Sequence, residues 1–106
     1  MNKKHRGTHT SLMDDAQEVV KILRKLTIVK GISPGIIVPK NTISNSRSIK
    51  ISQSNPDNLQ MINLTICSKI YTQKINILLS KPMFNGLEII KKALTGYALK
   101  YNINLR

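Results

Sequence analysis

Acidic residues are scarce in this chain, which has five of them against 17 lysines and arginines. The resulting formal net charge of +12 at pH 7 favours polyanionic partners, either nucleic acid or an anionic membrane surface. A genome rich in A and T offers another origin for the charge, because it raises Ile, Lys and Asn together. A genome of this kind does not by itself remove acidic residues. The shortage of Asp and Glu is therefore more informative than the excess of lysine.

Cysteine and long apolar runs are also lacking. Cys67 is the one cysteine, so no disulfide can form within the chain, which suits a reducing compartment. The N-terminal sequence MNKKHRGTHTS is basic with no apolar stretch behind it, unlike a secretory signal. No stretch approaches the roughly 18 apolar residues of a membrane-spanning helix. We therefore expect a cytoplasmic protein without a membrane span.

Aromatic residues make up only 4% of the chain, whereas hydrophobic residues together reach 41%. The core is therefore expected to be mostly aliphatic. A length of 106 residues suits one domain with one modest core. We assign residues 1–10 to a flexible basic arm and residues 11–106 to a single domain.

Two helices are predicted from apolar residues at helical spacing. The first begins at Ser11, whose hydroxyl can cap it, and its stripe consists of Leu12, Ala16, Val19, Val20, Leu23 and Leu26. The second spans about residues 87–101, and its stripe consists of Leu87, Ile90, Leu94, Tyr97, Ala98 and Tyr101.

Strands are predicted between the helices. Residues 27–38 are rich in β-branched side chains and are interrupted by a turn or bulge at Pro34-Gly35. Residues 47–53 alternate between polar and apolar side chains, and the NPDN sequence at 55–58 predicts a turn. Residues 59–80 predict a hairpin with a four-residue loop at 69–72, pairing Ile66 with Ile75, Leu64 with Ile77 and Ile62 with Leu79.

These elements predict an α+β fold: a helix, three to four antiparallel strands and a helix, with both helices on one face of the sheet. The other face is then polar, basic and free of acids, and it displays Ser48, Lys50, Ser52, Asn63, Thr65, Cys67, Lys69, Thr72, Lys74 and Asn76. A surface of this kind can track phosphates, although half-exposed antiparallel sheets commonly have a solvated polar face. No aromatic side chain is expected on it, which argues against base stacking.

Nucleic-acid binding is the function that the charge favours, with RNA or DNA as the partner. The candidate contacts are basic residues of the arm, the loops and the strands: Lys3, Lys4, Arg6, Lys30, Lys40, Arg47, Lys50, Lys69 and Lys74. A ribosome-associated or complex-associated subunit would use the same basic surface.

Metal binding is the competing function. His5 and His9 are four residues apart, and Asp14 and Asp15 follow them closely. Histidine nitrogen and carboxylate oxygen are ligands of divalent transition metals, zinc first among them. Gly7 and the threonines beside the histidines disfavour a helix there, so the pair would act from a loop, and two surface histidines in a basic arm are the alternative reading.

Several short motifs accompany these histidines. Gly7 and His9 precede Ser11-Leu12, paired valines follow at 19–20, ISPGII occupies 32–37, and INLTICSKIYTQKINILL forms the hairpin. Over about residues 7–80 the chain resembles a small prokaryotic family of unknown function labelled predicted metal-binding proteins. The resemblance implies a metal role for His9, followed by His5, and it implies no known reaction.

Catalytic motifs are lacking. The chain has no Gly-rich phosphate loop, no nucleophile elbow and no Cys-x-x-Cys pair, and Cys67 in an alternating strand is typical of a structural residue. We therefore expect a non-enzymatic binding protein. The resemblance favours metal binding, and the charge favours nucleic-acid binding.

Overall fold

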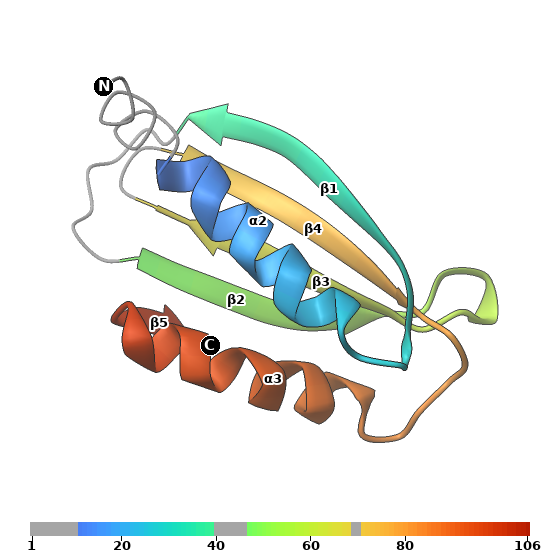
Figure 1. The fold of residues 1–106 in the computed structure, drawn as a ribbon. Coiled ribbons are helices and arrows are strands. Elements are labelled where there is room, and N and C mark those ends of the chain that lie inside the picture. The colour runs from blue at the N-terminus through green and yellow to red at the C-terminus, as the bar shows by residue number, and fades with distance from the viewer. Residues whose placement is uncertain (1–10, 40–46, 69–70) are drawn as a thin grey trace.

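The computed structural model describes residues 11–39, 47–68 and 71–106 (Figure 1). Helix α2 (Ser11–Arg24) is followed by strands β1 (Val29–Pro39), β2 (Arg47–Ser54), β3 (Met61–Cys67) and β4 (Tyr71–Leu79), helix α3 (Gly86–Lys100) and strand β5 (Ile103–Leu105). A short 3-10 helix, η1 (Pro56–Asn58), joins β2 to β3. The predicted α+β class is confirmed, and the arm predicted at residues 1–10 lies outside the described residues.

The strands form one sheet in the order β1-β4-β3-β2-β5. The first four are antiparallel to their neighbours, as predicted, whereas β5 pairs in parallel with β2. Strand β5 was not predicted, because three residues are too few to show a strand pattern. Asn102 adopts a left-handed φ of 55°, which turns the chain after α3, and Ile103 then buries its side chain in the core.

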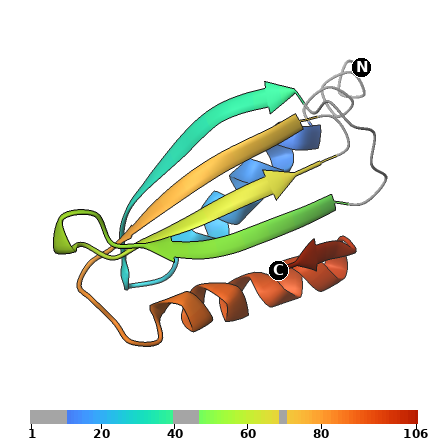
Figure 2. The same ribbon diagram turned by 180° about the vertical axis from the view of Figure 1, so that it is seen from behind.

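Both helices pack against the sheet and share one core with it. Val19 and Leu23 of α2 and Ile90 and Leu94 of α3 are fully buried. They share the core with alternating strand residues that are each at most 8% exposed: Ile49, Ile51, Ile62, Leu64, Ile66, Ile75, Ile77 and Leu79. This is the predicted apolar strand set. Seen from behind, the sheet lies in front of α2, and α3 runs along the β2 side (Figure 2). Neither helix in the described part of the chain is long and apolar enough to cross a bilayer.

The predicted register of the β3–β4 hairpin is wrong by two residues. Ile62 pairs with Ile77, Leu64 with Ile75 and Ile66 with Gln73. A shift of two leaves every side chain on the face where it was expected, because side chains alternate with a period of two. The correction changes the cross-strand neighbours on both faces, since it places Gln73 opposite Ile66 on the buried face and Lys74 opposite Thr65 on the other.

The predicted hairpin loop at 69–72 is also wrong, because Tyr71 and Thr72 already belong to β4. Only positions 69 and 70, which lie outside the described residues, separate Ser68 from Tyr71. The Ser68 backbone N–H donates to the Tyr71 carbonyl at 2.9 Å, and the Tyr71 N–H donates to the Ser68 hydroxyl at 3.2 Å. The turn prediction looked for Gly or Asn at the loop positions, whereas a serine hydroxyl beside the loop closes this turn.

Two further expectations concern the edges of the fold. The irregularity predicted at Pro34-Gly35 is a register shift between Pro34 and Ile37, and β1 continues through it. Tyr101 was expected in the apolar stripe of the second helix, but it lies after the last helical residue and is 43% exposed.

Candidate functional site

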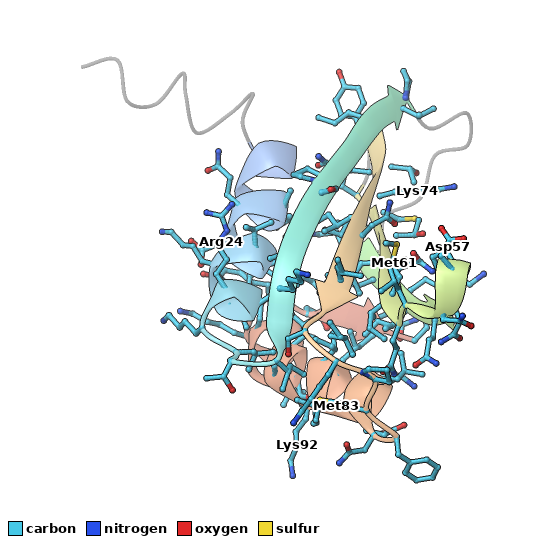
Figure 3. The ribbon with its side chains drawn as sticks, turned by 90° about the vertical axis from the view of Figure 1, so that its right-hand side faces the viewer. Arg24, Asp57, Met61, Lys74, Met83 and Lys92 are labelled. Atoms are coloured by element: carbon cyan, nitrogen blue, oxygen red, sulfur yellow. The ribbon has the colours of Figure 1, made fainter. Side chains whose placement is uncertain are left out.

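The face of the sheet that turns away from α2 carries short polar side chains and two lysines. We call it the open face. In the described residues it includes the apolar Val38, Met61 and Leu78 and the other residues Ser33, Ser48, Lys50, Ser52, Ser54, Asn63, Thr65, Cys67, Thr72, Lys74 and Asn76. Strand alternation sends these residues opposite to the buried set. Figure 3 shows Lys74 on the side of the sheet opposite Arg24, which belongs to α2.

The open face is organised in rows that cross the strands. Thr65 of β3 pairs with Lys50 of β2 on one side and with Lys74 of β4 on the other. Two strand spacings separate the lysine backbones by roughly 10 Å. Both lysines are exposed, and Thr65 is half-buried between them. The row therefore presents two ammonium groups with a hydroxyl between them.

A second row lies next to the first. It crosses four strands and consists of Ser33, Asn76, Asn63 and Ser52. Within the open face the Asn63 amide also donates to the Ser54 hydroxyl at 3.1 Å. Hydroxyl and amide groups of this kind can donate to phosphate and sugar oxygens, and they can accept from a sugar hydroxyl.

None of the five strands contains an aspartate or glutamate. The described acids lie elsewhere, on α2, on α3 and in η1. Asp57 in η1 follows β2 rather than belonging to it. The positive potential of Lys50 and Lys74 therefore meets no opposing carboxylate within the strands, which is the electrostatic condition for attracting a polyanion.

The other residues predicted to contact nucleic acid are placed unevenly. Lys30 is exposed on β1, at the edge of the sheet. Arg47, the first residue of β2, turns to the helix side instead of the open face. The remaining candidates, Lys3, Lys4, Arg6, Lys40 and Lys69, lie outside the described residues.

Arg47 is held in a buried polar cluster with residues from both helices. Its guanidinium donates to Oδ1 of Asp15 on α2, and the Tyr97 hydroxyl of α3 donates to the same oxygen at 2.8 Å. Asp15 is 7% exposed and Tyr97 is 8% exposed. Burial, followed by the hydrogen bond to Asp15, raises the pKa of Tyr97 above its usual value near 10.

This cluster joins two predictions that the sequence analysis had kept apart. Asp15 was a candidate metal ligand and Arg47 a candidate phosphate contact, and in the structure they bind each other. Tyr97 was assigned only to an apolar stripe. The signal that sequence reasoning could have used is the scarcity of acids, because a carboxylate on the buried face of α2 needs a charged partner.

The metal ligands implied by the sequence are not assembled in the described part of the chain. No three His, Cys, Asp or Glu side chains there lie close enough together to hold a metal ion. His5, His9 and the side chain of Asp14 lie outside the described residues, and the Asp15 carboxylate is engaged by Arg47 and Tyr97. Metal binding therefore stays a prediction.

No family model matches this chain, and neither a curated protein nor a solved structure matches it. The family resemblance noted in the sequence stays a prediction as well.

Proposed function

We propose that the protein is a non-enzymatic binding module that contacts the backbone of RNA or DNA through the open face of its sheet. One observation carries the proposal: Lys50, Thr65 and Lys74 form a cross-strand row on a sheet without an acidic residue in any strand. Lysine ammonium and hydroxyl groups bind phosphates, and each phosphate contact releases condensed counterions.

The composition of the open face favours backbone contacts over base recognition. None of its residues is aromatic, so it offers no platform on which unpaired bases could stack. The row of Ser33, Asn76, Asn63 and Ser52 adds uncharged groups that can bind sugar and phosphate oxygens. We therefore expect weak dependence on nucleotide sequence and strong dependence on salt.

The test compares charge reversal on the open face with charge reversal elsewhere. Binding of a fluorescent single-stranded RNA and a fluorescent duplex DNA is followed by anisotropy between about 50 and 200 mM salt. We expect Lys50→Glu/Lys74→Glu to weaken binding at least about tenfold and to lower the salt slope by about 1.5 to 2, because two phosphate contacts are lost.

The matched control is Lys81→Glu/Lys92→Glu, which changes the net charge by the same amount. Both of these lysines are exposed: Lys81 lies in the loop after β4, and Lys92, which is labelled in Figure 3, lies on α3. We expect this variant to lose at most a few-fold in affinity. Equal losses in the two variants would mean that net charge, and not the open face, attracts the nucleic acid, and a wild-type protein without salt-dependent binding would refute the proposal.

A further inference from the structure

A groove of about 360 Å³ lies on the helix side of the molecule, between α2 and the strands β1 and β4. Ala16 and Val20 of α2 and Pro34 of β1 form apolar walls, and Gln17 of α2 and Gln73 of β4 also line the groove. The volume falls within the range of small-molecule sites, roughly 300 to 1,000 Å³. The groove is separated from the open face by the thickness of the sheet.

Gln73 is the unusual member of this groove. It occupies a core-facing position of β4, on the same face of the strand as Ile75, Ile77 and Leu79, and it is 5% exposed. Its Oε1 atom is buried without a hydrogen-bond partner in the described part of the chain. An unpaired buried acceptor costs about 1 to 3 kcal/mol, so its presence needs an explanation.

The backbone of β1 does not satisfy this amide. The Gln73 Nε2 atom lies 3.5 Å from the Gly35 carbonyl, a long contact at the limit of hydrogen bonding. The two strands are close here, because a Cβ on Gly35 would lie 2.7 Å from the Lys74 carbonyl oxygen. The amide therefore has an unused acceptor and a weakly engaged donor side by side.

Two cations of α2 line the groove one helical turn apart. Lys21 and Arg24 are both exposed. Glu18 lies 3.9 Å from Lys21, and both of these side chains are largely exposed, so water screens this pair. No ion pair involves Arg24 among the described residues. The groove thus combines apolar walls, one buried amide and a positive rim.

We infer that this groove binds a nucleoside monophosphate, with the base against Gln73 and the phosphate beside Lys21 and Arg24. A glutamine amide presents an acceptor next to a donor, which matches the exocyclic amino group and ring nitrogen of adenine. Ala16, Val20 and Pro34 supply the apolar contacts for the faces of a planar base, and the rim supplies the charge for the phosphate. The inference is independent of nucleic-acid binding at the open face.

The experiment is isothermal titration calorimetry of the full chain with adenosine monophosphate, beside separate titrations with adenosine and inorganic phosphate. We expect saturable binding of the monophosphate at least about tenfold tighter than either fragment, because base and phosphate contacts act together. Gln73→Leu and Lys21→Glu/Arg24→Glu should each weaken the binding about tenfold or more, whereas Lys50→Glu/Lys74→Glu should leave it unchanged.

Three results would overturn the inference. The first is the absence of any heat of binding with the monophosphate. The second is inorganic phosphate that binds as tightly as the monophosphate, which would reduce the site to an anion-attracting rim. The third is unchanged binding in Gln73→Leu, whose folding is verified separately by its thermal unfolding midpoint.

Discussion

Two glutamines with equal burial differ in what their amides bind. Gln60 and Gln73 are each 5% exposed. The Gln60 Nε2 atom donates to the Met83 carbonyl at 2.8 Å and to Gln53 Oε1 at 2.9 Å, and its Oε1 accepts the Met83 N–H. The Gln73 Oε1 atom has no partner in the described part of the chain. Burial alone therefore does not reveal the role of a polar side chain, whereas its unused hydrogen-bonding capacity does.

The first glutamine is structural. Its amide ties the start of β3 to the loop between β4 and α3, and its backbone carbonyl accepts the Leu79 N–H at 3.1 Å. The space around it is tight, because a Cβ on Gly86 would lie 3.1 Å from the Gln60 Nε2 atom. The second glutamine lines the groove, and its Oε1 atom accepts no hydrogen bond in the described part of the chain, which is why we propose it as a binding residue.

The largest effect is expected for Gln60→Leu. It leaves the Met83 N–H without its partner and removes one of two donors to the Met83 carbonyl, which keeps the Gly86 N–H at 3.2 Å, so the free energy of unfolding should fall by about 2 kcal/mol. Urea denaturation with far-ultraviolet circular dichroism measures the change. A loss below about 0.5 kcal/mol would show that water replaces the amide, and the contrast with Gln73 would then disappear.

A smaller effect is expected at the buried cluster on the other side of the core. Tyr97→Phe removes the hydroxyl that donates to Asp15, while Arg47 keeps its contact with that carboxylate. The free energy of unfolding should fall by about 1 kcal/mol at neutral pH. Tyr101→Phe removes a phenol that lies beside the Tyr97 ring but leaves the Asp15 contacts intact, so it is the control.

The wild type and Tyr97→Phe should also differ in how their stability depends on pH. The pKa of Tyr97 is raised in the folded state, so above about pH 10 the unfolded chain releases the phenolic proton while the folded chain retains it. The contribution of the Tyr97 phenol to the free energy of unfolding is fully present below about pH 10 and is lost as the pH rises further. Thermal midpoints from pH 8 to 11 should therefore fall more steeply for wild type than for Tyr97→Phe, and parallel profiles would contradict the assignment.

The smallest effect, of opposite sign, is expected for Gln73→Leu. Replacing an unpaired buried amide with an apolar side chain of similar shape should leave stability unchanged or raise it by up to about 1 kcal/mol. Chemical denaturation under the conditions used for Gln60→Leu gives the direct comparison. A loss above about 1 kcal/mol would mean that Gln73 supports the fold.

Sequence reasoning located the open face correctly because alternation in β2, β3 and β4 is strict. Lys50 and Lys74 were placed there, whereas the row that joins them through Thr65 follows from the observed register and was not predicted. The contact of Arg47, a candidate for nucleic-acid binding, with Asp15 was not predicted, because Asp15 lies 32 residues earlier in the chain. A contact over such a separation leaves no local pattern in the sequence.

The hairpin register shows a second limit of sequence reasoning. Matching apolar residues across the strands favoured Ile66 opposite Ile75, but the turn is closed by Ser68 and places Gln73 there instead. Both registers bury the same faces, so the hydrophobic pattern could not distinguish them. The groove could not be predicted either, because its walls come from α2, β1 and β4 and depend on how these elements pack.

The sequence by itself determined the α+β class, the helices, the alternation of the strands and the acid-free open face, because each of these follows from local periodicity and composition. Only the tertiary structure decided the parallel pairing of β5, the partner of Asp15 and the unpaired acceptor of Gln73. These depend on which distant groups meet in the folded chain. The satisfaction of a buried polar atom is a property of its surroundings, and the residue type alone does not determine it.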